Sequence, residues 1–247
     1  QAAALLVTTV DRARAAGVPR ERWVFPLSAT ESNLSVPVLH RPELHRSRGA
    51  ALAGHRALEL AGVEIADLDH LDLYSCFPAA VQVFAAELGV DLERGPAPTV
   101  TGGMTFAGGP LNNYVLQSTA AMARALRADP GGTGLVTAVS GMLHKQGFAA
   151  WSTEPPAAGF RCEDVTARVG ELEPRRAETG DHVGPVTVVG QTVVHERDGS
   201  ARALAVAETT EGLRVLAGTA DPDLVDRFTH DDLVGQTLRA DGAELRA

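Results

Sequence analysis

The sequence predicts an α/β fold followed by a small β-rich domain. Up to residue 152, short apolar runs alternate with helical patterns of 10–15 residues, which is typical of a layered fold with a mostly parallel sheet. After the proline-containing segment Thr153–Ala158 the pattern changes to valine-rich strands with tight turns. Residues 159–247 also hold 17 Asp and Glu against 10 Arg, a net charge of −7, whereas the rest of the chain is nearly balanced. We therefore expect two domains, 1–158 and 159–247.

The elements of the first domain follow from local signals. The apolar run Ala2–Thr8 is expected to be a buried parallel strand. Ser47 can cap a helix that Gly62 ends, and Pro78 suits the first position of another helix. The other expected elements are a helix at Val10–Ala16, a strand and loop at Arg22–Pro37, helices at Arg48–Ala61, Pro78–Leu88 and Asn113–Ala128, and strands at Leu71–Cys76, Gly134–Ser140 and Gln146–Ser152.

The second domain reads as a series of antiparallel strands. Asp198-Gly199 and Glu211-Gly212 are hairpin signals between valine-rich runs. The expected elements are strands at Pro185–Arg197, Ala201–Glu208, Leu213–Gly218 and Val234–Leu238 and a helical turn at Pro222–Phe228. This pattern favours a small β-barrel of the oligonucleotide/oligosaccharide-binding (OB) kind. The acidity of the domain argues against nucleic acid, so we expect a packing or docking module.

Composition limits the partners and the cellular compartment that we expect for the protein. The net charge of −9 argues against nucleic acid and anionic membranes as partners, and no apolar run is long enough for a membrane span. Two cysteines form no disulfide framework and no zinc spacing, so we expect no metal site and a reducing, cytoplasmic setting. The chain lacks an initiator Met and opens directly on an apparent core strand, from which we expect a longer protein with residues upstream of Gln1.

A glycine-rich segment, Thr101–Tyr114, is the candidate ligand site. It contains two double glycines, a proline and an Asn-Asn-Tyr directly before a helical run. Glycine lets the backbone approach a ligand closely, and a helix start offers free N–H groups. Asn112 and Asn113 are expected to be helix caps first and ligand contacts second.

This segment resembles the Gly-His-Pro motif of the thiolase superfamily, with Gly109 at the histidine position. Leu71–Phe77 resembles the family's Asn-Glu-Ala-Phe region and, more closely, the His-Asp-Cys-Phe variant of sterol-carrier-protein thiolases. Residues 135–152 resemble the last two strands of that fold. With the β domain appended, the chain resembles the C-terminal half of the thiolase-like protein type 1 group, generally described as acetyl-CoA acetyltransferases.

The resemblance implies a thioester chemistry whose usual side chains are missing here. Thiolases use a nucleophilic Cys, an activating His and a second Cys as acid and base. The nucleophile belongs to the family's N-terminal half, Gly109 replaces the activating His, and no sulfur lies around Ala138–Ser140. Tyr74 and Ser75 stand where Asn-Glu or His-Asp would be. No standard catalytic residue can therefore be assigned.

Several residues remain candidates for a substrate or CoA pocket. Tyr74 follows a strand end and is equally compatible with pocket lining and core packing, while Cys76 is expected to be a small core residue. The turn with His144 points toward the active site in the thiolase fold, although related sequences carry Thr-Lys-His there, which argues against a base role for His144. The candidates are Tyr74, Ser75, Gly108, Gly109, Asn112, Asn113, Ser140, His144, Lys145 and Gln146.

The resemblance therefore implies an acyl-CoA-binding, acyltransferase-like protein of lipid metabolism. CoA or acyl-CoA is expected as substrate or ligand, with no resident cofactor, and a thiolase-like N-terminal half as partner. The alternative is a non-catalytic scaffold or partner subunit that docks through its acidic β domain.

Overall fold

The computed structural model describes all residues, 1–247, in two compact units. The first unit contains Gln1–Ser35 and His45–Leu172, and the second contains Val36–Leu44 and Glu173–Ala247. None of the helices is both long and apolar enough to cross a membrane. The first unit contains α1 (Val10–Ala15), β1 (Phe25–Ser32), α2 (Arg48–Ala61), β2 (His70–Asp72), α3 (Pro78–Leu88), α4 (Met104–Ala107), α5 (Tyr114–Ala128), β3 (Thr133–Ser140), β4 (Lys145–Ser152), β5 (Arg161–Asp164) and α6 (Thr166–Leu172).

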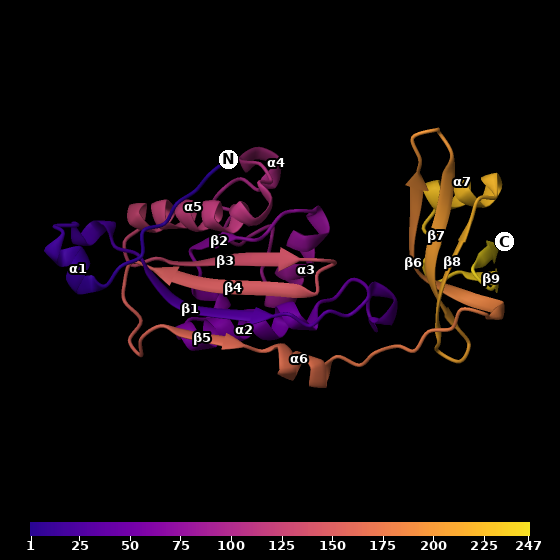
Figure 1. Cartoon of the computed structure of the whole chain (residues 1–247), viewed down its shortest axis with the longest axis horizontal. Coiled ribbons are helices and arrows are strands. Elements are labelled where there is room, and N and C mark those ends of the chain that lie inside the picture. Colours follow the sequence, from indigo (N-terminus) through magenta and orange to yellow (C-terminus); the bar gives the residue numbers. More distant parts are fainter. The chain divides into compact units, whose positions relative to one another are not determined.

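The first unit is built on a five-stranded mixed sheet with the order β2-β3-β4-β1-β5 (Figure 1). β2 is parallel to β3, and β1 is parallel to β5, whereas β4 is antiparallel to both of its neighbours. We expected a mostly parallel sheet. All strands except β4 do run in the same direction, but because β4 lies in the middle of the sheet, only the β2–β3 and β1–β5 pairs are parallel. The short turn between β3 and β4 is the reason, because a tight turn can join only antiparallel strands.

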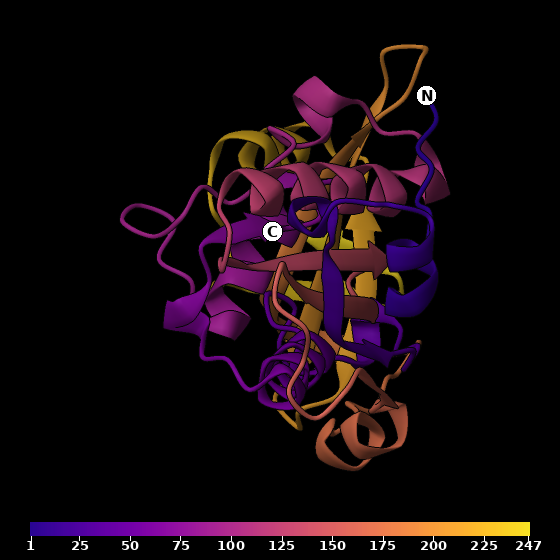
Figure 2. The ribbon, with the colours of Figure 1, turned by 90° about the vertical axis from the view of Figure 1, so that its left-hand side faces the viewer.

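Helices cover both faces of this sheet. The small residues Ala50, Ala53 and Ala57 place α2 against β1 and β4, and Phe84 of α3 stacks on Phe148 with ring centroids 5.4 Å apart. On the other face, Met122 and Leu126 of α5 pack on Val136 of β3. Successive strand residues alternate between the two faces, which is why Leu135 and Val136 belong to different clusters. Figure 2 shows α5 lying across one side of the strands.

Several predicted elements have the predicted bounds. Ser47 caps α2 by accepting the N–H of Ala50, and Gly62 ends the helix in the left-handed conformation at φ +71°. α3 begins at Pro78 and ends at Leu88, as predicted. These helices are specified locally, by a cap residue, a proline and a terminal glycine.

Other predictions for the first unit were wrong. Ala2–Thr8 forms no strand and is largely exposed, with Leu6 95% accessible, because no strand of the sheet pairs with it. The strand predicted at Leu71–Cys76 ends at Asp72, since Tyr74 donates its backbone N–H to the Thr137 hydroxyl instead of to a neighbouring strand. The predicted boundary at 158 also differs from the structure, because β5 pairs with β1 and extends the first unit to Leu172.

The second unit is a closed five-stranded barrel with the order β10-β8-β7-β6-β9. Gly199 and Gly212 take positive φ in the two predicted hairpins. Alternate small and branched side chains fill the interior, and Leu224 and Phe228 of a short helix pack against them. Its elements are β6 (Val183–His195), β7 (Ala201–Thr209), β8 (Arg214–Thr219), α7 (Pro222–His230), β9 (Thr237–Asp241) and β10 (Glu244–Arg246).

A buried arginine attaches residues 36–44 to this barrel. Arg214 is 1% exposed, and its Nη2 donates to the carbonyl oxygens of Pro42 at 2.8 Å and Arg41 at 3.4 Å. Its Nε lies 3.5 Å from the Glu208 carboxylate. Burial lowers the pKa of Arg214, and the neighbouring Glu208 opposes that effect. The barrel therefore holds a segment that precedes it by more than a hundred residues in the chain.

The close approach of α2 to the core gives a first prediction. A methyl group at Gly54 would overlap Cδ2 of Leu88 and come within 3.2 Å of the Phe148 ring. We expect Gly54→Ala to destabilise the first unit by about 1–3 kcal/mol, because overpacking outweighs the gain in helix propensity. The control Gly170→Ala lies on an exposed helical position with room for a methyl group and should stabilise slightly. Urea denaturation followed by fluorescence of Trp23 and Trp151, both in the first unit, tests this; equal stability of the two variants would contradict it.

Candidate functional site

The candidate site lies where β2 ends and the glycine-rich segment begins. The chain leaves β2 after Asp72, and the segment that enters the glycines runs beside it, with a bridge between Asp72 and Thr99 and a hydrogen bond from the Leu73 N–H to the Pro98 carbonyl. Ser75 then accepts the backbone N–H of Met104, the first residue of α4, at 2.9 Å. The glycine-rich segment is thus fixed against residues 72–75.

Asp72 is the buried anchor of this region. Its carboxyl group is fully buried, and Oδ2 accepts both the backbone N–H and the hydroxyl of Thr101, at 3.1 and 2.8 Å. Oδ1 is buried without a hydrogen-bond partner. Burial raises the pKa of Asp72, and the hydrogen bonds from Thr101 only partly oppose this shift. The group is therefore easier to protonate than an exposed aspartate.

Two tyrosines continue the network from Thr101. The Thr101 hydroxyl lies 2.8 Å from the Tyr114 hydroxyl, and Tyr114 is fully buried at the start of α5. The rings of Tyr74 and Tyr114 meet edge to face with centroids 5.3 Å apart. Burial raises the pKa of both tyrosines, so both keep their protons at neutral pH. Tyr74 is only partly buried, so its ring packs against Tyr114 and is also partly accessible at the site.

The glycines of the segment have different roles. Gly103 and Gly108 have φ of +79° and +86°, a conformation that favours glycine. Gly109 has no positive φ, and an added Cβ would meet only the Met104 sulfur at 3.8 Å, an ordinary contact. The position that resembles the family's histidine therefore has room for a Cβ atom.

The asparagines do not act as predicted. Asn113 precedes α5 in a right-handed helical conformation and makes no side-chain capping bond, because the short 3₁₀ turn Leu111–Asn113 runs directly into the helix. Asn112 is exposed, and the Nδ2 of Asn113 is buried without a partner. The expectation that these residues are helix caps was wrong.

The β3–β4 turn is held by a second network. Gln146 is buried and its Nε2 donates to the Leu143 carbonyl at 2.7 Å and the Ser47 hydroxyl at 2.9 Å. Ser140 and Lys145 face each other as exposed residues where the two strands leave the turn. The partly buried His144 ring lies over Gly141. Of the predicted turn residues, Gln146 is structural, and the other three lie closer to solvent.

Glu87 supports this second network from the end of α3. Its side chain is 2% exposed, and it accepts hydrogen bonds from the Nε and Nη2 of Arg46 at 2.7 and 2.9 Å and from the Ser47 N–H at 2.7 Å. Burial raises the pKa of Glu87, but the hydrogen bonds from Arg46 and Ser47 outweigh it, and the net pKa is lowered. Glu87 thereby places Ser47 for both its capping role and its contact with Gln146.

The structure joins some of the predicted residues and not others. Tyr74 and Ser75 lie together with the glycine-rich segment, while Gln146 belongs to the Ser47 network. A pocket shared by Gly108, Gly109, Tyr74, Asn112 and the 144–146 turn stays a prediction. Cys76 was expected in the core but is exposed, because the chain has already left β2 when it reaches residue 76.

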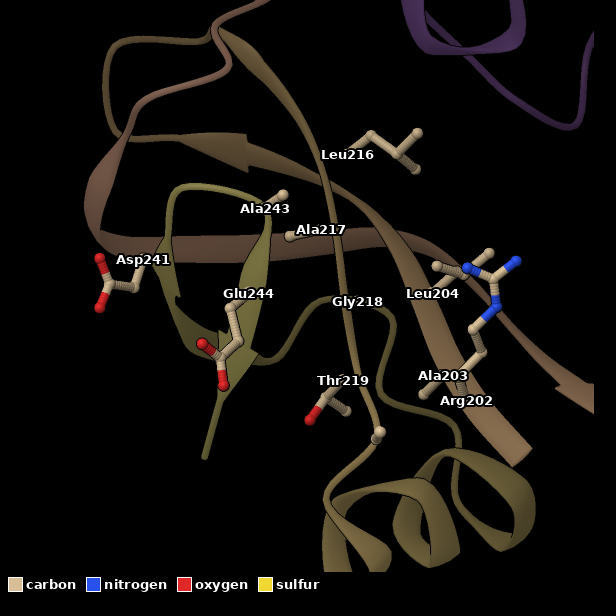
Figure 3. Close-up of a pocket in the computed structure, with 11 residues that line it drawn as sticks. Arg202, Ala203, Leu204, Leu216, Ala217, Gly218, Thr219, Asp241, Ala243 and Glu244 are labelled. Carbon is tan, nitrogen blue, oxygen red and sulfur yellow. The ribbon is translucent and has the colours of Figure 1, made fainter. Parts of the chain in front are cut away.

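A separate pocket lies on the barrel and is lined by residues of β7, β8, β9 and β10. It has a volume of about 730 Å³ and is open to solvent. Figure 3 shows Glu244 and Asp241 on one side of Gly218 and Arg202 and Leu204 on the other. Leu216 lines it and is 54% exposed. Nothing in the strand pattern of the sequence pointed to this pocket.

The comparison with known structures covers both units of the chain. The chain superposes on a monomeric SCP2-thiolase-like protein type 1 from Mycobacterium smegmatis with a TM-score of 0.84 and 29% sequence identity, over 96% of this chain and 53% of that one. The chain is therefore similar, over nearly its whole length, to a thiolase-like protein. It spans about half the length of the Mycobacterium smegmatis protein.

Two yeast thiolase structures are less similar to the chain in sequence and in fold. The peroxisomal 3-ketoacyl-CoA thiolase of Saccharomyces cerevisiae shares 23% identity over 53% of this chain and 34% of that one, with a TM-score of 0.42. The dimeric peroxisomal thiolase of the same yeast shares 22% identity over 58% of this chain and 33% of that one, with a TM-score of 0.43. Searches against protein-family models and against curated proteins find no match.

The Glu87 network gives a prediction with a defined pH dependence. We expect Glu87→Gln to destabilise the first unit by about 2 kcal/mol at pH 7, because it replaces charge-assisted hydrogen bonds with neutral ones. The folded pKa of Glu87 lies below its unfolded value, so this stabilisation is present above pH 4.5 and is lost as pH falls through the folded pKa. The difference between wild type and variant in urea denaturation should therefore narrow toward pH 3.

Glu93 is exposed, so Glu93→Gln serves as the control for Glu87→Gln. Its stability in urea should equal that of wild type at both pH 7 and pH 3. A stability difference between wild type and Glu87→Gln that stays constant from pH 7 to pH 3 would contradict the lowered pKa of Glu87.

Proposed function

We propose that this chain is the C-terminal thiolase-like half of a cytoplasmic protein that binds CoA thioesters. The observation that carries the proposal is the glycine-rich segment, which Asp72 and Ser75 hold at the carboxyl end of β2 within a thiolase-like fold. In a sheet of this kind, ligands bind beyond the carboxyl ends of the strands. The main chain from Gly102 to Gly109 can approach a ligand closely because four of its residues lack side chains.

The composition of this edge favours binding over standard thiolase catalysis. The side chains there are hydroxyl groups and a buried carboxyl, and Gly109 offers space instead of an imidazole. We infer an acetyl-CoA acetyltransferase homologue of lipid metabolism in which acyl transfer is unusual or lost. CoA or its thioester is the ligand, and the protein needs no resident cofactor.

Exposed apolar residues support a thiolase-like N-terminal half as the covering partner. Phe77, Phe106 and Leu111 are 70%, 86% and 83% exposed, and all three adjoin the candidate site in the chain. Large apolar side chains at this exposure are typical of a surface that another part of a protein covers. The match to only about half of the Mycobacterium smegmatis protein is consistent with such a half.

Substitution of Gly109 tests the proposal. We expect Gly109→His in the full-length protein to change the affinity for acetyl-CoA by about fivefold or more, the effect of gaining or losing roughly one hydrogen bond or close contact. Thermal stability should change little, because Gly109 has no positive φ and an added Cβ would make only an ordinary contact. Isothermal titration calorimetry and a melting curve measure the two quantities.

Gly108→Ala is the control for backbone strain, since Gly108 has φ +86° and ψ 156°, where a residue with a Cβ is strained by about 1–3 kcal/mol. A folded Gly109→His variant with unchanged affinity would favour a packing role for the glycine pair. Lack of binding by the wild-type protein to any of a panel of acyl-CoAs would overturn the proposed function.

The alternative function is a docking subunit of a lipid-metabolism complex. The barrel, which we propose to be OB-like, carries the open pocket of Figure 3, whose lining combines apolar Leu204 and Leu216 with Arg202 on one side and the acidic pair Asp241 and Glu244 on the other. A short protein segment with an apolar centre and charged ends fits this arrangement.

A photo-crosslinking residue tests that alternative. Placed at Leu216, it should trap a lipid-metabolism enzyme in cells, because this side chain lines the pocket and faces solvent. The same residue at Val234, which is similarly exposed but does not line the pocket, should give no such product. Equal labelling from both positions would argue against a docking role for the pocket.

A further inference from the structure

The hydroxyl of Thr101 is the centre of a chain of hydrogen bonds that can point in two directions. Its Oγ1 lies 2.8 Å from Oδ2 of Asp72 and 2.8 Å from the Tyr114 hydroxyl, and it accepts the N–H of Gly103 at 3.2 Å. A hydroxyl group has a single proton to donate. Thr101 can therefore donate to Asp72 or to Tyr114, but not to both.

The charge of Asp72 decides between these directions. An ionised carboxylate only accepts, so Thr101 then donates to Asp72 and Tyr114 donates to Thr101. A proton on Oδ1 would be a buried donor without an acceptor, whereas a proton on Oδ2 meets the Thr101 oxygen at 2.8 Å. Protonated Asp72 therefore donates to Thr101, and the Thr101 proton turns to Tyr114.

Thr101 also ties this network to the glycine-rich segment. Its backbone N–H donates to Oδ2 of Asp72 at 3.1 Å. The hydroxyl group that reverses therefore belongs to the segment that Ser75 also holds, through the Met104 N–H at 2.9 Å.

The surroundings of Asp72 contain no competing charge. Thr101 and the main chain of Val100 act on it from the glycine-rich segment and Tyr114 acts on it from α5, while the residue opposite it on β3 is the apolar Val136. His70, on the same strand, is paired with Asp129 at 3.0 Å. The titratable neighbours beyond Tyr114 are Tyr74 and Cys76, and both Cys76 and Tyr114 raise the pKa of Tyr74.

We propose that Asp72 is a positioning residue whose protonation sets the direction of the Asp72–Thr101–Tyr114 hydrogen bonds. With Asp72 ionised, Tyr114 donates to Thr101 and Thr101 donates to Asp72; with Asp72 neutral, both hydrogen bonds run in the opposite direction.

Tyrosine NMR tests the reversal without a ligand. The chain has two tyrosines, so labelling with [ζ-¹³C]tyrosine gives two signals, and Tyr74→Phe identifies the one from Tyr114. We expect the Tyr114 signal to titrate above pH 4 in wild type and to be insensitive to pH in Asp72→Asn. Asp11→Asn, whose carboxylate is 91% exposed, should keep the wild-type titration.

Variants of Thr101 separate a relay from a direct effect of charge. Thr101→Val keeps the Asp72 carboxyl but removes the connecting hydroxyl, and the Tyr114 titration should shrink; Thr101→Ser should restore it. A wild-type Tyr114 signal that does not titrate between pH 4 and 8, or one that titrates equally in Asp72→Asn, would overturn the proposal.

Discussion

The first unit depends on how one buried carboxylate, Glu87, is satisfied. It accepts three hydrogen bonds from Arg46 and Ser47, and its own backbone carbonyl lies 3.1 Å from the His55 ring. These contacts fix the start of α2 against the end of α3. A buried carboxylate without them would be costly, so the position of residues 46–47 follows from electrostatics as well as packing.

The placement of α2 then determines the spacing of the layers. Hydroxyl groups of Ser28 and Thr30 on β1 donate to the α2 carbonyls of Ala57 and Ala53, each at 2.6 Å. Such contacts require the helix backbone to lie close to the strand, which the alanines and Gly54 on this face allow. Ser47 also contacts Gln146. The same carboxylate thus influences the turn between β3 and β4, almost 60 residues farther along the chain.

Local signals in the sequence predicted most helices and the hairpins, because capping residues, prolines and glycines act within a few residues. The failures involve partners that are distant in the chain. Ala2–Thr8 has the composition of a strand, but a strand forms only where another strand can pair with it. Asp72, Thr101 and Tyr114 were not recognised as a network, since each is unremarkable in sequence and only folding brings their oxygen atoms within 2.8 Å. An acidic residue in an otherwise apolar strand was the available signal.

The candidate site combines a rigid support with neutral polar groups. Its carboxyl group is fully buried, and its accessible chemistry consists of hydroxyl groups and main-chain N–H groups on a glycine-rich segment. Such a site suits recognition of an uncharged oxygen better than activation of a thiol, because no imidazole takes part in the hydrogen bonds of Thr101 and Ser75.

The attachment of residues 36–44 to the barrel affects how the protein can be made. These residues are synthesised before the barrel, because Arg214, which holds the carbonyl groups of Arg41 and Pro42, follows more than 170 residues later. Until then residues 36–44 have no barrel to attach to. The nascent chain must therefore keep this segment available throughout synthesis of the first unit, and a truncation before the barrel would leave it permanently without its partner.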